Sequence, residues 1–264
     1  MKNLLIAFLF ISLSGFSQEK YKLLRKIDVQ ADLFTTDNQC NIYVVKNNEL
    51  IKYDKEGKQL YKYSNKNFGK ISSVDASNML RVVIYYRDFL TIVFLDKTLT
   101  ESSTPLNLQT LNLTQIPIVC ASGNKSNMWL FDQSVFALMQ YTENFDQQNL
   151  NTIGNLNNIV TDSLQPVSMI EYNNKLYMNN PKSGVIVFDN YGTYYKTLPL
   201  KDLQYFQPIA DWVYYADGKK IRAYNIKTTE EKEFDAPVDF KAFRLENDIL
   251  LLQDEHSVTL YTAP

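Results

Sequence analysis

Short runs of apolar residues separated by polar turns recur along the whole chain. The stretch 37–64, DNQCNIYVVKNNELIKYDKEGKQLYKYS, shows the unit most clearly, with Ile42 and Val44 in one run and Leu50 and Tyr53 in the next. An Asn-Asn pair and a Glu-Gly pair form the breaks between the runs. Alternating β-branched and aromatic residues bounded by turn residues are typical of antiparallel strands. The stretch is therefore predicted to be a β-meander with one sheet face that needs a cover.

The same pattern is repeated six times. The third strands of the repeats have anchors near Tyr53, Leu95, Tyr141, Phe188, Tyr224 and Tyr261. Successive anchors are separated by about 42, 46, 47, 36 and 37 residues. A period near 40–50 residues with about four strands in each repeat is typical of β-propellers. We therefore predict an all-β, six-bladed β-propeller, with a two-sheet sandwich or an irregular β-solenoid as the structural alternatives.

The two ends of the repeat array complement each other. The sixth repeat lacks a fourth strand, and the run 22–29, KLLRKIDV, is a strand without a partner beside it. Pairing these two would close the ring and remove two open sheet edges, which are sites of aggregation. We therefore expect strand 22–29 to complete the last blade. The longer segments 98–115 and 144–165 are predicted to be solvated loops between blades, or alternatively a binding surface.

The N-terminal 17 residues have the pattern of a secretory signal peptide. A basic start is followed by the apolar run 4–13 and by small residues at Gly15 and Ser17. The apolar run is shorter than the about 20 residues that a membrane-spanning helix needs. We predict cleavage after Ser17 and a single propeller domain over 18–264. The predicted location is the periplasm, either free or associated with the outer membrane. A retained membrane anchor is the alternative, and no other stretch is predicted to span a membrane.

Charge and cysteine content narrow the range of partners. The formal net charge is −2, and Lys and Asp/Glu are scattered through every segment without a basic stripe. Nucleic-acid binding therefore has no electrostatic support and is not expected. The two cysteines, Cys40 and Cys120, are expected to be buried free thiols, although an exported protein permits a disulfide between them.

The sequence contains no recognisable catalytic set. Its single histidine, His256, lies in a predicted turn between Glu255 and Ser257, and the chain has no HExxH, G-x-S-x-G or Gly-rich phosphate-binding motif. The expectation is therefore a protein that is not an enzyme, with no catalytic residues, no metal and no cofactor. As an alternative, Asp32, Asp75, Asp211 and Asp239 lie near the predicted inner strands, where carboxylates could converge in the channel on a metal or as an acid/base pair.

Aromatic side chains point instead to binding. Several short stretches contain more consecutive aromatics than one sheet face can bury, and Tyr and Arg are enriched at protein–protein hot spots. Four of these residues fall at predicted turns and are the candidates for a protein-interaction surface: Tyr86, Arg87, Tyr191 and Tyr205. The other aromatics are expected to pack between blades.

Three strand–turn–strand units resemble those of the six-bladed propellers typified by NHL-repeat proteins. They are NIYVV…ELIKYDKEGKQLYKY, KLYMNN…GVIVFDNYGTYYKTL and VYYADGKKIRAYNI, in which a polar turn after Tyr/Phe-Asp/Asn leads to the outer strand. The resemblance implies the fold and no activity. The SGFSQ signal-peptide end and the Asn-, Lys- and Tyr-rich composition are similar to those of exported Bacteroidota-type proteins.

Two functions are carried forward from these observations. The first is a non-catalytic exported propeller that acts as a protein-interaction subunit, placed by analogy in an outer-membrane type IX secretion translocon as a periplasmic plug-like component. The second is a propeller that binds a carbohydrate or small ligand, or acts on it as a hydrolase or lyase, through a carboxylate site in its channel.

Overall fold

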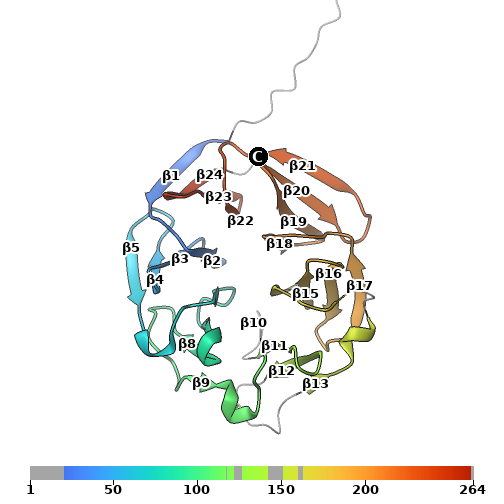
Figure 1. Cartoon of the computed structure of the whole chain (residues 1–264). Helices are drawn as coiled ribbons and strands as arrows, with labels where there is room; N and C mark the ends of the chain where they lie inside the picture. Colours follow the sequence, from blue (N-terminus) through green and yellow to red (C-terminus); the bar gives the residue numbers. More distant parts are fainter. Residues whose placement is uncertain (1–20, 117, 122–126, 142–150, 160–162, 263–264) are drawn as a thin grey trace, which may run out of the picture.

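The computed structural model is a ring of six blades around a central channel (Figure 1). It describes residues 21–116, 118–121, 127–141, 151–159 and 163–262. Each blade is a four-stranded antiparallel sheet whose strands follow one another from the channel outward. The predicted six-bladed propeller is confirmed, and the sandwich and solenoid alternatives are wrong. The predicted signal peptide lies outside the described residues.

The strands keep the same order in every blade. Blades one to three contain β2 (Leu33–Thr36), β3 (Ile42–Lys46), β4 (Glu49–Tyr53), β5 (Gln59–Tyr63), β6 (Ser73–Asp75), β7 (Val82–Tyr86), β8 (Thr91–Leu95), β9 (Leu106–Asn107), β10 (Ile118–Ala121), β11 (Met128–Asp132), β12 (Ala137–Tyr141) and β13 (Asn151–Ile153). Blades four to six contain β14 (Ser168–Tyr172), β15 (Lys175–Asn180), β16 (Gly184–Asp189), β17 (Tyr194–Leu198), β18 (Phe206–Ile209), β19 (Trp212–Asp217), β20 (Lys220–Asn225), β21 (Glu231–Asp235), β22 (Ala242–Glu246), β23 (Ile249–Gln253), β24 (Ser257–Thr262) and β1 (Leu23–Asp28). Short 3₁₀ helices in the described connections are η1 (Lys66–Phe68), η2 (Arg87–Phe89), η3 (Leu108–Leu111) and η5 (Leu156–Asn158).

The middle strands of a blade are apolar on both faces because both faces are covered. Every residue of β7, β8 and β11 is buried, whereas the outer strand β5 is almost entirely exposed. A sheet that packs on one side only would alternate apolar and polar residues, but a blade lies between two neighbours. The continuous apolar runs in the sequence therefore mark the middle of each blade.

An acidic or amide side chain shapes the turn that leads to the outer strand in four of the blades. The residue is either the last of the third strand or the one directly after it, and it is Asp54, Asp96, Asp189 or Asn225. Its side-chain Oδ1 accepts hydrogen bonds from backbone N–H groups of the turn at 2.8–3.0 Å. Short Asp and Asn side chains stabilise turns by such local hydrogen bonds. This is the physical basis of the repeated Tyr/Phe-Asp/Asn pattern in the sequence.

The last blade is built from both ends of the described chain. Strand β1 pairs antiparallel with β24, with Ile27 opposite Val258 and Asp28 opposite Ser257, and Figure 1 shows the blue β1 beside the red β24. The backbone N–H of Thr262 also donates to the carbonyl of Lys22 at 3.0 Å. The partner of the N-terminal strand is thus β24, the one expected from the sequence, and not β2.

Six clusters of buried apolar side chains hold the blades together. Each cluster joins one pair of neighbours around the ring, and the cluster that contains Ile27, Phe34, Ile42 and Leu251 joins blade six to blade one. Burial of apolar area is the dominant favourable term in folding. Each meander is therefore covered by the next one, and the ring leaves no blade face without a neighbour.

The two long segments are packed more closely than predicted. Segment 98–115 contains the outer strand β9 and helix η3, and the side chains of Leu99, Leu108 and Leu113 in it are buried. In segment 144–165 the side chains of Leu156 and Leu164 are buried, while residues 144–150 and 160–162 lie outside the described residues. The prediction of solvated loops is therefore wrong for these leucines, because each apolar side chain packs in a cluster between two neighbouring blades.

The cysteines lie in different blades. Cys40 follows the inner strand of blade one and Cys120 belongs to β10 of blade three, and both are free and buried. Burial raises the pKa of both thiols above its ordinary value, most strongly for Cys120. The expectation of two buried free thiols is confirmed.

Candidate functional site

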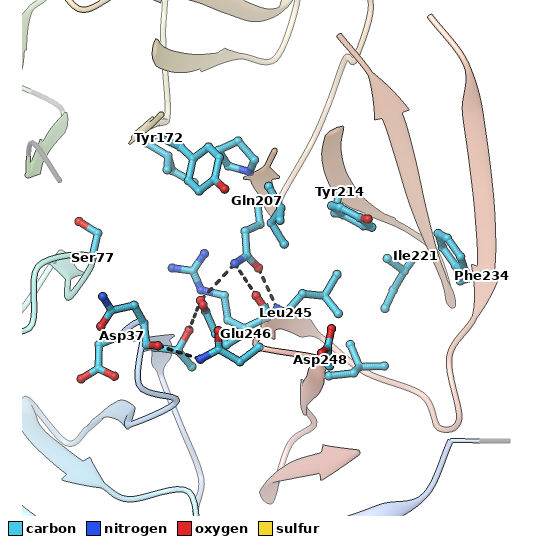
Figure 2. A pocket seen from close by; sticks show the side chains of 18 of the residues that line it. Asp37, Ser77, Tyr172, Gln207, Tyr214, Ile221, Phe234, Leu245, Glu246 and Asp248 are labelled. Atoms are coloured by element: carbon cyan, nitrogen blue, oxygen red, sulfur yellow. Dashed lines mark hydrogen bonds between the residues drawn. The ribbon is translucent and has the colours of Figure 1, made fainter. Parts of the chain in front are cut away.

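A cavity of about 510 Å³ lies at the face of the ring on which the inner strands end. The ends of the inner strands of blades one, four, five and six line it with Thr36, Tyr172, Gln207 and Glu246, and the last three are labelled in Figure 2. Ligand cavities commonly have volumes of about 300–1,000 Å³ and occur where several elements converge. The size and position of this cavity suit a small molecule.

Glu246 and Gln207 form the polar centre of the cavity. The Gln207 side chain joins blades five and six, since its Nε2 donates to the Leu245 carbonyl at 2.9 Å and its Oε1 accepts from the Leu245 N–H at 2.9 Å. Glu246 Oε1 accepts from Thr36 Oγ1 at 2.7 Å and from Gln207 Nε2 at 3.2 Å. Figure 2 shows the labelled Gln207 and Glu246 side chains meeting in the middle of the site. The carboxylate is thus held in one orientation by donors from two other blades.

Burial alters the acidity of Glu246. Loss of hydration raises the pKa of its carboxyl above the ordinary value, while the hydrogen bond from Thr36 and the charge of Arg244 act in the opposite direction. Desolvation is therefore the dominant effect. A half-buried carboxylate with a raised pKa at the mouth of a channel is a recognised mark of functional sites.

Arg244 places a guanidinium beside this carboxylate. It lies two residues before Glu246 on β22, so both side chains leave the same face of the strand. Arg244 NH2 donates to Thr35 Oγ1 at 2.6 Å. Within the part of the chain that the structure describes, no carboxylate lies within 4.0 Å of this guanidinium. Most of its five N–H donors therefore remain available to a bound molecule.

Asp37 lines the cavity but is engaged by its own turn. Its Oδ1 accepts from the backbone N–H groups of Gln39 and Asn41, and its Oδ2 accepts from the hydroxyl of Tyr43 at 3.0 Å. Lys52 Nζ lies 3.9 Å from Oδ2, and both side chains are almost completely buried. Asp37 is thus a structural carboxylate that fixes the wall of the cavity.

The other end of the cavity is apolar. It extends between blades five and six, where Tyr214, Ile221, Phe234 and Leu250 line it, and Figure 2 shows the first three on the opposite side of Glu246 from Asp37. Tyr21 lies at this end and packs edge-on against Tyr261, with the ring centroids 6.4 Å apart. A polar centre next to an apolar compartment is the arrangement that orients an amphipathic ligand.

The four predicted interaction residues do not form one surface. Tyr86 is completely buried in β7, where its ring lies 5.5 Å from that of Phe68, so it is unavailable to a partner. Arg87 begins η2 and Tyr205 directly precedes β18, both at the face opposite the cavity; Arg87 is exposed and Tyr205 is half-buried. Tyr191 is 71% exposed at the edge of blade four. Exposure was expected for all four, and Tyr86 departs because both faces of a blade are covered.

The predicted channel carboxylates do not converge either. Asp211 pairs with Lys227 at 2.9 Å and Asp239 with Lys219 at 2.7 Å, on the exposed surface. Asp32 accepts a hydrogen bond from the backbone N–H of Asn47, in the turn between β3 and β4, and Asp75 accepts one from the backbone N–H of Ser77 in its own turn. Among the described residues, no group of three His, Cys, Asp or Glu side chains could hold a metal ion. The predicted carboxylate set is wrong, and Glu246 takes its place.

His256 is an exposed turn residue. Its backbone N–H donates to Asp254 Oδ1 at 2.6 Å, in the turn between β23 and β24. This agrees with its predicted place in a turn.

Comparison with known proteins identifies the fold and no family. No family model matches the chain, and no curated protein matches it. A solved streptogramin B lyase shares 13% identity at a TM-score of 0.58, with 93% of this chain and 87% of that one covered. Virginiamycin B lyase from Staphylococcus aureus shares 10% identity at a TM-score of 0.61, with 93% and 100% covered. BBS1N, solved in complex with ARL6DN, shares 13% identity at a TM-score of 0.51, with 85% and 75% covered.

The lyases overturn the expectation that the chain is not an enzyme. Two proteins with this architecture and nearly complete mutual coverage are enzymes, so the lack of a familiar catalytic motif was not a sound reason for excluding catalysis. At 10–13% identity the likeness shows the fold alone, and one fold hosts many functions. The residues of the cavity must therefore decide what the site does.

The described part of the chain contains no helix with the length and apolarity needed to cross a bilayer. The expected periplasmic location and the expected place in a type IX secretion complex stay predictions.

Sequence reasoning missed Arg244, Glu246 and Gln207. The signal was present in the last repeat, where the run KAFRLENDILL contains charged residues in an otherwise apolar inner strand. Such residues mark a polar surface inside the channel, since a strand covered on both faces is otherwise apolar. Only the convergence of blades one, five and six shows that they form one site.

Proposed function

We propose that the protein binds a small polar ligand in the cavity at the end of its central channel. The observation that carries this proposal is the half-buried guanidinium of Arg244, which faces the cavity beside Glu246 without a carboxylate within 4.0 Å among the described residues. Removing a charge from water is costly unless it is paired. An anionic group of a ligand that pairs with this guanidinium would therefore stabilise the complex, because the charge has no carboxylate partner in the described protein.

The shape of the site supports the same proposal. Polar groups from three blades are oriented by hydrogen bonds between blades, so the ligand meets a preorganised surface. The apolar compartment adds area for a hydrophobic group. The lyases named for streptogramin B and virginiamycin B share this architecture. The experiment that tests binding should therefore also test whether the bound molecule is chemically converted.

Thermal-shift measurements on the mature protein test this proposal. The panel consists of amino acids, sugars, nucleotides and organic acids, and we expect at least one class to raise the melting temperature. Ser77→Trp places a large ring at the exposed polar edge of the cavity and should abolish this shift. Ser102→Trp is the matched control, because it is an exposed serine of the same blade outside the cavity.

Mass spectrometry of the stabilising compound after incubation shows whether it is also converted. A panel with no stabilising compound, or a shift that Ser77→Trp leaves unchanged, contradicts binding in the cavity.

A second proposal is that the protein docks an envelope protein through blade four. It is supported by three exposed tyrosines on one outer hairpin, Tyr191, Tyr194 and Tyr195, with exposed fractions of 71%, 43% and 55%. Tyrosine is enriched at hot spots of protein interfaces. BBS1N, a protein of the same fold, was solved with a protein partner. On this proposal the protein is a periplasmic interaction subunit, and an outer-membrane type IX secretion component is the partner to look for.

Crosslinking in the native envelope, followed by purification, tests the docking proposal. We expect a specific envelope partner that the triple variant Tyr191→Ser, Tyr194→Ser, Tyr195→Ser no longer captures. Recovery of the same proteins by the wild type and the triple variant would contradict a docking role for blade four.

A further inference from the structure

We propose that the ligand of the cavity is a free α-amino acid with an apolar side chain, whose carboxylate binds Arg244 and whose ammonium binds Glu246. Its side chain would enter the compartment formed by Tyr214, Ile221 and Phe234. This inference rests on the proposed function and names the chemical class of ligand that the same site takes.

The carboxylate follows from the open donors of Arg244. The guanidinium has five N–H donors in a planar fork that matches a carboxylate with two parallel hydrogen bonds. One nitrogen, NH2, donates to Thr35 Oγ1, a neutral acceptor. No acidic group of the described chain lies within 4.0 Å of the guanidinium, so its counter-charge must come from the ligand or from solvent.

The ammonium follows from the open oxygen of Glu246. Both donors that hold this carboxylate, Thr36 Oγ1 and Gln207 Nε2, bind Oε1. Oε2 accepts no hydrogen bond from the residues that the structure describes. A carboxylate oxygen has room for about two hydrogen bonds, and an ammonium is the strongest donor for it.

The two charged groups lie close enough to serve one small molecule. Arg244 and Glu246 are two residues apart on β22, and their tips hydrogen-bond to consecutive residues of β2, Thr35 and Thr36. The charge of Arg244 acts on Glu246, but the two groups form no ion pair within 4.0 Å among the described residues. A zwitterion placed between them would satisfy both charges at once.

The remaining carboxylates on the wall do not compete for the ammonium in the same way. Asp37 is buried and occupied by its turn and by Lys52, and Glu171 accepts from Trp129 Nε1 at 2.6 Å. Asp248 is exposed, and water screens the field of an exposed charge. Glu246 is therefore the carboxylate at the centre of the site with an oxygen open to a ligand.

The apolar compartment determines which side chain the amino acid should carry. Ile221 and Leu250 are almost completely buried and form its floor, with the rings of Tyr214 and Phe234 beside them. Burying a large apolar side chain away from water stabilises a complex. Amino acids with large apolar side chains should therefore bind more tightly than glycine or serine.

Calorimetric titration of the mature protein with four matched compounds tests the inference. L-phenylalanine carries both charges, phenylalaninamide carries only the ammonium, N-acetylphenylalanine carries only the carboxylate, and N-acetylphenylalaninamide carries neither. We expect phenylalanine to bind the wild type at least tenfold more tightly than either singly charged analogue. The uncharged compound should bind most weakly.

Each of two variants should abolish the preference for one of the two charged groups of the ligand. In Arg244→Gln, phenylalanine and phenylalaninamide should bind equally well, because the carboxylate has lost its partner. In Glu246→Gln, phenylalanine and N-acetylphenylalanine should bind equally well. Circular dichroism and melting curves establish that both variants fold, and Arg244→Lys is a second variant that keeps the charge but loses the fork.

The outcomes separate the inference from the proposed function. If the four compounds bind equally, or if each variant retains the wild-type ranking, the inference is wrong. If other members of the broad panel bind in a way that Ser77→Trp abolishes while all four compounds fail, the cavity binds a ligand of another class and only the inference is lost. If no compound of either panel binds, both fail.

Discussion

Glu246 is a carboxylate that the fold holds partly away from water. Its pKa is raised chiefly by lost hydration, while Arg244 lowers it and Asp37, the other nearby charge, raises it. A raised pKa in the folded protein means that the folded state binds the proton more tightly than the unfolded chain does. Ionisation of Glu246 therefore disfavours folding, and the free energy of unfolding decreases as the pH rises from the unfolded pKa, about 4.3, through the folded one.

Glu246→Gln should remove this part of the pH dependence. Glutamine keeps an oxygen that can accept from Thr36 and Gln207 but carries no charge. We expect the stability of the variant relative to the wild type to improve as the pH rises through this window, as measured by urea unfolding at pH 4, 5, 6 and 7. The other carboxylates titrate in both proteins and cancel in the difference. A difference that is the same at every pH would contradict the prediction.

Gly184 is a single residue on which the hairpin of blade four depends. It has a φ of +114°, and a Cβ at this position would lie 2.1 Å from the carbonyl oxygen of Leu198. Gly184→Ala combines strain in the backbone with a clash against the neighbouring strand, and should lower the free energy of unfolding by about 2–6 kcal/mol. Gly154→Ala is the control, because a Cβ there meets no atom within 4 Å. Denaturant unfolding of both variants measures the contrast, and equal effects would contradict it.

At the scale of elements, the turn after β2 connects two blades. Asp37 fixes this turn, and its partner Lys52 donates to the carbonyl of Lys97 in blade two at 3.1 Å. Loss of hydration lowers the pKa of Lys52, and the charge of Asp37 acts in the opposite direction. The buried pair is thus part of the contact between the first two blades.

Asp37→Ala should be strongly destabilising. It leaves the ammonium of Lys52 buried without its counter-charge, and breaking a buried pair in this way costs about 3–5 kcal/mol. Asp54→Ala removes the same kind of turn hydrogen bond at a solvated outer turn and should cost only about 0.5–1.5 kcal/mol. Urea unfolding of both variants measures the difference. The double variant Asp37→Ala, Lys52→Met should recover part of the loss, and no recovery would contradict the charge argument.

The elements could be predicted from sequence to the extent that their determinants are local. The third strands and the turns at Asp54, Asp96 and Asp189 were predictable, because alternation, β-branching and turn chemistry act within a few residues. The burial of Tyr86 could not be found in this way, since it depends on the neighbouring blade. Arg244 and Glu246 were missed for the same reason: residues far apart in the chain, Thr35, Thr36 and Gln207, give them their roles.

At the scale of the whole molecule, the ring depends on the pairing of β1 with β24. A protein that lacks residues up to Asp28 has an unpaired β24 edge and loses Ile27 from the cluster between blades six and one. We expect this truncated protein to melt at a lower temperature and to self-associate, because an open edge strand pairs with other chains. A synthetic peptide of residues 21–29, added in trans, should restore the melting temperature and suppress the self-association.

A peptide of the same composition in scrambled order is the control. Rescue by both peptides, or by neither, would contradict a specific role of β1 in closure. Melting curves and size-exclusion chromatography give the two readouts.

The shared blade also has a consequence for the time course of folding. Lys22 and Thr262, which hydrogen-bond to each other, are separated by 240 positions in the chain, so β1 has no partner until β24 has been synthesised. Contacts of such large sequence separation form slowly, because the intervening chain must be ordered first. The ring can therefore close only after β24 has left the ribosome. Until then β1 is an unpaired strand that chaperones can recognise, and a late, slow kinetic phase sensitive to changes in β1 is its expected signature.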